Sequence, residues 1–88
     1  MIFVIRGPLR RFVGFKPEVQ VDAGTVQDGI SVLCRQYPDL RCALLDASGQ
    51  LRGVHRLALN RTLLHRSELE TPVDSGDVLE LVTALAGG

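Results

Sequence analysis

Short runs of apolar residues at the start of the chain predict two strands. Residues 2–6 form a β-branched and aromatic run that stops at Gly7-Pro8, a pair that breaks strands. Residues 18–22 alternate polar and apolar side chains, as a half-buried strand does. Residues 9–16, between the two runs, are expected to form a long and partly basic hairpin connection.

The apolar pattern then changes to a helical period. Thr25 followed by Asp28 resembles a capping box with Asp in place of Glu, so we expect a helix to begin there. Pro38 is expected to end it, because the residue before a proline avoids the helical region, and residues 40–45 are expected to add a short helical turn. The apolar residues that share one face of the predicted helix are Val26, Ile30, Leu33, Cys34 and Tyr37.

The second half of the chain predicts three further strands. Residues 54–59 support one, with Leu57 and Leu59 on the same face. Asn60-Arg61 can turn the chain into a shorter strand near residues 62–64. Residues 78–83 form the most β-prone run, apolar enough to be a central strand with a neighbour on each side. The order of elements predicts one small α+β domain.

Length and charge narrow the class of protein. The chain has 88 residues, room for one domain. Ten basic residues, all Arg except Lys16, balance ten acidic ones. Nucleic acid and anionic membranes are therefore not expected as main partners, since both require a basic surplus. The apolar run at residues 1–6 is too short for a signal peptide or a membrane span, so a cytoplasmic location is expected.

Reactive side chains form no recognisable catalytic or metal-binding pattern. Cys34 and Cys42 lack the spacing of a CxxC or Cys/His ligand set, and Cys34 is expected to be buried. His55 and His65 are ten residues apart and have no acidic or Cys partner at ligand spacing. We therefore expect a chain that binds no metal or cofactor itself and is not an enzyme.

The end of the chain is unusual. After Glu80 no charged residue follows, and the sequence ends in Leu85-Ala86-Gly87-Gly88. Glycines at the end of a strand cost backbone entropy and pack against nothing. A backbone without side chains can instead pass through a narrow channel and present its terminal carboxylate inside another protein. Gly88 is therefore the candidate reactive residue.

Several segments together resemble a known family. Residues 8–12 are similar to a PLRE-like segment, residues 25–38 to a TV…L…YP helix, and residues 46–51 to a D-x-x-G-x-L turn. Residues 71–79 are similar to a T-P-L-x-D-G-D-x-V run, and residues 84–88 to a P-A-V-A-G-G ending. These features resemble the MoaD/ThiS family of sulfur carriers, which share the β-grasp fold with ubiquitin.

The resemblance implies a fold and also shows two departures. It implies an α+β, ubiquitin-like β-grasp domain over residues 1–83, with a mixed four- or five-stranded sheet, one main helix on one face, and a flexible diglycine tail over residues 84–88. Arg61 stands where the family commonly has glycine, so the turn is expected to be built differently or to be longer. The proline common in the family's tail is absent.

The resemblance also implies a function. An E1-like adenylating enzyme of the MoeB/ThiF type would activate the Gly88 carboxylate with ATP and Mg²⁺, both bound by that enzyme. A sulfur donor protein would then convert Gly88 to a thiocarboxylate. The acceptor would be a biosynthetic enzyme such as the large subunit of molybdopterin synthase. The chain's length is nearer to that of the molybdopterin synthase small subunit or the cysteine-pathway carriers than to that of the thiazole type, and the molybdopterin type is favoured. Two alternatives stay open, a ubiquitin-like modifier conjugated through Gly88 to lysines and a β-grasp interaction module with an inert tail.

The partner-docking surface is predicted on the sheet face away from the helix. Phe3, Leu59 and Leu81 are the apolar candidates there; a shift of one residue in the facing of a strand would exchange this set for its neighbours. Arg10 and Arg11 are candidates for pairing with carboxylates of a partner.

Overall fold

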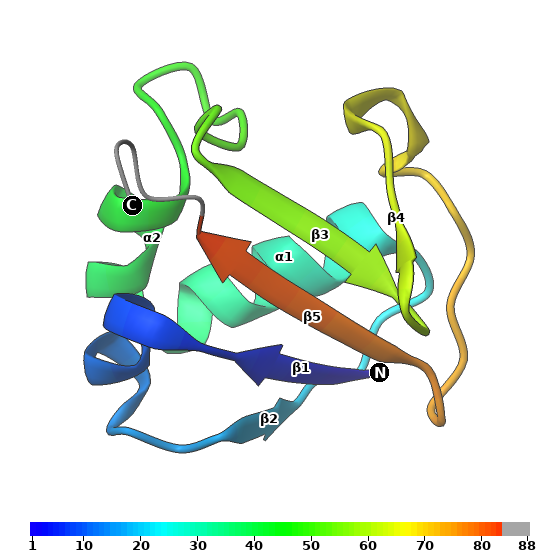
Figure 1. Cartoon of the computed structure of the whole chain (residues 1–88), viewed down its shortest axis with the longest axis horizontal. Coiled ribbons are helices and arrows are strands. Elements are labelled where there is room, and N and C mark those ends of the chain that lie inside the picture. Colours follow the sequence, from blue (N-terminus) through cyan, green and yellow to red (C-terminus); the bar gives the residue numbers. More distant parts are fainter. Residues whose placement is uncertain (84–88) are drawn as a thin grey trace.

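The computed structural model in Figure 1 describes residues 1–83. One mixed sheet lies in front of the main helix, and the short helices η1 and α2 lie together at one end of the molecule. The elements in chain order are β1 (Ile2–Ile5), η1 (Gly7–Val13), β2 (Glu18–Gln20), α1 (Val26–Gln36), α2 (Pro38–Leu44), β3 (His55–Leu59), β4 (Thr62–Leu63), η2 (Arg66–Glu68) and β5 (Val78–Thr83), where η denotes a 3₁₀ helix.

The described sheet has five strands in the order β2-β1-β5-β3-β4. β5 lies in the middle, parallel to β1 and antiparallel to β3, so that Leu81 is beside both Ile5 and Leu57. The prediction of a central last strand is confirmed. With α1 covering one face, this is the α+β, β-grasp arrangement expected from the sequence.

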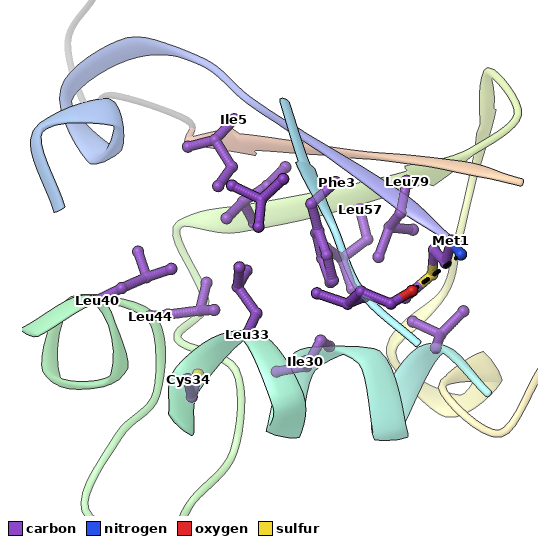
Figure 2. Close-up of a cluster of buried hydrophobic side chains, with 14 of the residues drawn as sticks. Met1, Phe3, Ile5, Ile30, Leu33, Cys34, Leu40, Leu44, Leu57 and Leu79 are labelled. Atoms are coloured by element: carbon purple, nitrogen blue, oxygen red, sulfur yellow. Dashed lines mark hydrogen bonds between the residues drawn. The ribbon is translucent and has the colours of Figure 1, made fainter. Parts of the chain in front are cut away.

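α1 begins and ends where the sequence predicts. The backbone N–H of Asp28 donates to Thr25 Oγ1 at 3.1 Å, which satisfies one of the free N–H groups at the helix start. Tyr37, immediately before Pro38, is the residue at which α1 ends. The apolar face of α1 packs against the sheet, and Figure 2 shows Ile30 and Leu33 pointing toward the strand residues.

Close contact between α1 and β1 explains a glycine inside the helix. A Cβ atom at Gly29 would lie 1.8 Å from the Met1 Cε atom and 3.4 Å from the Phe3 ring. The Met1 side chain is itself buried, and its nitrogen donates to the Val21 carbonyl at 3.1 Å (Figure 2). The helix therefore loses some intrinsic propensity at Gly29 but packs more closely on the sheet.

Cys34 is buried, as predicted. Burial raises the pKa of its thiol, although the nearby Arg41 acts in the opposite direction. The uncharged thiol is the form that a buried site favours. Cys34 is therefore a packing residue of α1.

The segment after β1 differs from the expected hairpin connection. Residues 7–13 form the 3₁₀ helix η1, with Pro8 in its first turn. Leu9 and Val13 from this helix are buried in the core, and Gly14 ends it in the left-handed region, with φ of 66°. The connection is thus a folded lobe attached to the core by two apolar side chains.

The turn between β3 and β4 is short, so the longer turn, one of the two expectations drawn from Arg61, is wrong. It has two residues, Asn60 and Arg61, with φ of 48° and 71°, the mirror-image geometry that hairpins favour. Asn60 fastens this turn to β5, because its Oδ1 accepts from the Val78 N–H at 2.9 Å. Arg61 is therefore a bulky residue in a conformation that suits glycine.

Replacing Arg61 with glycine is expected to stabilise the fold. The left-handed conformation costs a non-glycine residue about 1–2 kcal/mol, and the added freedom of glycine in the unfolded chain offsets about half of that. We expect a net gain of about 0.5–1 kcal/mol in the free energy of unfolding, measured by urea titration. The control Arg61→Ala removes the charge but keeps the strain and should show no such gain; a loss of stability in Arg61→Gly would contradict the account.

Asp77 should make the fold sensitive to acid. The pKa of its carboxyl is lowered, first by the N–H of Asp74 at 2.7 Å and then by the side-chain amide of Asn60 at 3.0 Å. Because the folded-state pKa lies below the unfolded value, the stability from this group is complete above the unfolded pKa, about 3.9. It is lost as the pH falls through the folded-state pKa.

Asp77→Asn tests this effect directly. The variant should be less stable than the unmodified chain at neutral pH, and the difference should shrink as the pH falls below about 4. Urea titrations at several pH values measure it. An unchanged difference across that range would show that Asp77 does not contribute through its charge.

Candidate functional site

β5 leads directly to the predicted reactive end of the chain. Thr83 is its last residue and pairs with His55 of β3. The predicted tail residues Leu85, Ala86, Gly87 and Gly88 lie outside the described residues. We call the end of β5 at Thr83, from which the predicted tail starts, the tail root.

The predicted facing of the three apolar docking residues is wrong. Phe3 and Leu81 are both 0% exposed. The register places Phe3 beside Leu79 and Leu81 beside Leu57, and Figure 2 shows Phe3 and Leu79 above α1. The strand facing was shifted by one residue in the prediction. Leu59 is half-buried and packs against the same core, so these three side chains build the fold instead of the open surface.

The alternate residues of these strands lie on the side of the sheet away from α1. We call this side the open face. Its exposed large apolar side chains are Leu63, which is 65% exposed, and Val82, which is 41% exposed. Val82 is the last of its side chains before the tail root. The strand pairings place ten residues on this face: Ile2, Val4, Glu18, Gln20, Arg56, Ala58, Leu63, Val78, Glu80 and Val82.

One ion pair crosses the open face near the tail root. Arg6 Nε lies 3.3 Å from Glu80 Oε2, with side chains 65% and 27% exposed. Such an exposed pair contributes less than about 1 kcal/mol to stability. Glu80 lies between Val4 and Ala58 of the neighbouring strands. The open face therefore combines apolar side chains with a carboxylate that is paired with Arg6.

A buried histidine holds the strand beside the tail root. His55 is 4% exposed, and its Nε2 atom lies 2.8 Å from the carbonyl oxygen of Ala43 in α2. A carbonyl oxygen only accepts, so the Nε2–H group is the donor of this bond. The bond ties the start of β3 to α2. Sequence reasoning had considered His55 only as a metal ligand and missed this positioning role.

Arg10 and Arg11 are exposed on η1, as their predicted role in docking requires. Arg10 Nη2 donates to the carbonyl of Phe15 at 3.1 Å. The Arg11 guanidinium lies 4.9 Å from the centre of the Phe12 ring. Neither arginine forms an ion pair with a carboxylate of the described residues.

Metal binding finds no support in the part of the chain that the structure describes. Residues 1–83 contain no group of three or more His, Cys, Asp or Glu side chains placed to hold a metal ion. Among the same residues, no helix has both the length and the apolar character needed to cross a membrane.

A family model decides the identity of the chain. The model of the ThiS family matches residues 4–88, which include every element from η1 to β5 and the diglycine end. The chain belongs to the ThiS family. Proteins of this family are sulfur carriers and do not catalyse the transfer themselves. No curated protein matches the sequence at a significant level.

Solved structures agree on the fold of this ThiS-family chain. SAMP1 from Haloferax volcanii is similar, with a TM-score of 0.87 and 24% identity over 100% of this chain and 98% of that one. CysO from Mycobacterium tuberculosis has a TM-score of 0.81 and 24% identity, covering 96% and 98%. The BexX/CysO complex of Amycolatopsis orientalis gives 0.85 and 24%, covering 99% and 98%. At this identity the likeness shows the β-grasp fold.

Proposed function

We propose that this chain carries sulfur as a thiocarboxylate on Gly88 and donates it in the biosynthesis of a cofactor or metabolite, with the molybdopterin pathway favoured. One observation carries the proposal: the family match extends through Gly88, five residues beyond the end of the central strand at Thr83. A reactive group at Gly88 is thus joined to a central strand of the sheet, and residues 81–88, which lead to it, carry no charged side chain.

The chemistry takes place in partner proteins. An E1-like adenylating enzyme of the MoeB/ThiF type binds ATP and Mg²⁺ and joins AMP to the Gly88 carboxylate, with release of pyrophosphate. A persulfide of the sulfur donor protein displaces AMP and forms an acyl disulfide with Gly88. A thiol then cleaves that disulfide, which leaves the Gly88 thiocarboxylate and a disulfide between the donor and the thiol. A biosynthetic enzyme, such as the large subunit of molybdopterin synthase, then accepts the sulfur. We propose that the whole cycle takes place in the cytoplasm.

This chain's own residues position the tail. α1 and the core fix β5, and His55 holds the neighbouring strand to α2 through Ala43. The open face offers Val82, Val4 and Ile2 to a partner that receives the tail. A structure of the similar CysO is a complex with BexX, and we propose a partner enzyme of that kind here.

Adding a charge at Val82 is expected to weaken docking without unfolding the domain. The side chain is 41% exposed, so Val82→Glu should change the free energy of unfolding by only about 0.5 kcal/mol. An unpaired carboxylate buried against a partner should raise the KM for the carrier by about tenfold or more. ATP–pyrophosphate exchange by the adenylating enzyme measures this.

Ser31→Glu is the matched control for Val82→Glu. It adds the same charge to an exposed position of α1, on the other side of the sheet, and should leave the KM unchanged. An equal KM for the Val82 variant and the unmodified chain would show that partners do not use the open face.

Intact mass tests the proposed function. The full chain is incubated with ATP, Mg²⁺, the adenylating enzyme from the same organism, a persulfide sulfur donor and a thiol reductant. Exchange of one oxygen for one sulfur in the product supports the proposal. ATP consumption without that exchange, or no reaction at all, contradicts it; the second result favours an interaction module with an inert tail.

Conjugation to other proteins is the second candidate function, because the similar SAMP1 is a small archaeal modifier protein. The last tryptic site of this chain is Arg66. Conjugates would therefore carry residues 67–88 on target lysines in a cell digest. Detection of such branched peptides, lost when Gly88 is deleted, would favour the modifier.

A further inference from the structure

Positive charge is concentrated in one part of this neutral chain. Residues 6–16 contain Arg6, Arg10, Arg11 and Lys16 and no acidic residue, and the first acidic side chain is Glu18. We call residues 6–16 the basic lobe. Of its four cations, only Arg6 forms an ion pair with a described carboxylate, that of Glu80.

An aromatic ring is exposed at the tip of the basic lobe. Phe15 is 67% exposed and has a φ of 61°. A left-handed backbone is unfavourable for a bulky residue, and the ring gains little from burial in the free protein. Residues strained in this way cluster at functional sites.

Hydrogen bonds hold the Phe15 backbone in place. Its N–H donates to the Arg10 carbonyl at 2.9 Å, and its carbonyl accepts from Arg10 Nη2 at 3.1 Å. Leu9 and Val13 of the same segment are buried in the core. The ring is thus presented on a fixed backbone, which lowers the entropy that binding must overcome.

The basic lobe lies next to the tail root. η1 contacts both α2 and β5, and Figure 1 shows it at the same end of the molecule as the end of β5. A protein that takes up the tail therefore meets the basic lobe as well.

We propose that the basic lobe is a second docking site, which seats Phe15 in an apolar pocket on an acidic protein surface beside the channel that receives the tail. The identity of that partner, the adenylating enzyme, rests on the proposed function. Aromatic residues, including Phe, and Arg are enriched in protein interfaces, and Trp, Tyr and Arg are enriched among the few residues that supply most of the binding energy. Arg11 and Lys16 face outward to pair with carboxylates, and their charge should speed association at low salt.

Phe15→Gly separates binding from folding. Glycine suits the left-handed backbone, so the variant should unfold at a higher urea concentration than the unmodified chain. We expect the KM for the carrier in adenylation to rise by about tenfold or more, with kcat unchanged. Phe15→Tyr keeps the ring and should keep the KM.

Charge reversal gives the second arm of the test. Lys16→Glu should raise the KM at low salt and reduce its dependence on ionic strength. Arg61→Glu, a matched reversal in the turn between β3 and β4, should change neither. Equal KM values for Phe15→Gly and the unmodified chain would overturn the second docking site and leave the proposed function intact.

Two further results separate the alternatives. If the unmodified chain is not adenylated, the proposed function fails. Calorimetric titration with the same enzyme then tests the second docking site by itself. Weaker binding of Phe15→Gly than of the unmodified chain supports the docking site, and equal or absent binding overturns it. Phe15-dependent sedimentation with vesicles of equal phosphatidylcholine and phosphatidylglycerol, at an unchanged KM, would assign the lobe to membranes and overturn the proposal.

Discussion

Phe3→Ala is expected to cost about 3–5 kcal/mol of folding free energy. The ring is 0% exposed and lies between Val19 and Leu79 in the neighbouring strands, on the α1 side of the sheet. Domains of this size have a total stability of only about 5–10 kcal/mol. Urea titration should therefore show a large fall in the midpoint concentration of unfolding, with a fraction of the molecules unfolded even without urea.

Val4→Ala is the matched control for Phe3→Ala. Val4 is the next residue of the same strand and lies on the open face, where it is half-buried. Its truncation should cost about 1 kcal/mol or less. A loss at Val4 as large as that at Phe3 would contradict the assignment of the two faces.

Deletion of Gly88 is expected to abolish thiocarboxylate formation completely. The deletion removes the candidate reactive carboxylate and places a new one a residue short of the reacting position. A displacement of this size removes the positioning on which such reactions depend. Intact mass after the full reaction measures the loss.

Stability provides the control for this deletion. The core described here consists of residues up to Leu81, so the urea midpoint should not change when Gly88 is removed. Full thiocarboxylate formation by the shortened chain would contradict the account.

Sequence patterns predicted the helix and the central strand because both have strong local signals. Thr25, Asp28 and Pro38 mark the two ends of α1, and its apolar face has a helical period. The η1 helix was missed, although Pro8 in its first turn and the four-residue spacing of Leu9 and Val13 were available as signals.

The facing of the strands was predictable in β5 but not in β1. In β5, the polar Glu80 marks the outward side, so its neighbours Leu79 and Leu81 had to face the core. In β1, every residue from Ile2 to Ile5 is apolar, so neither face is distinguished. Only the pairing of β1 with β5 resolves it.

The features of the candidate site depended on contacts between distant parts of the chain. The contact between His55 and Ala43 joins β3 to α2, and no local sequence pattern predicts this contact. The left-handed backbone of Phe15 also lacks a signal, because phenylalanine seldom adopts it. Gly88, in contrast, is a candidate reactive residue from the sequence alone, because the sequence ends in two glycines after an uncharged segment.

The central claim is that Gly88 carries the sulfur, and the position of the sulfur tests it most directly. After the full reaction, trypsin cleaves after Arg66 and leaves residues 67–88 as the C-terminal peptide. We predict that this peptide alone gains sulfur in place of one oxygen, with fragmentation placing the change at Gly88. Sulfur found instead on the peptide that contains the exposed Cys42, with the C-terminal peptide unchanged, would contradict the account.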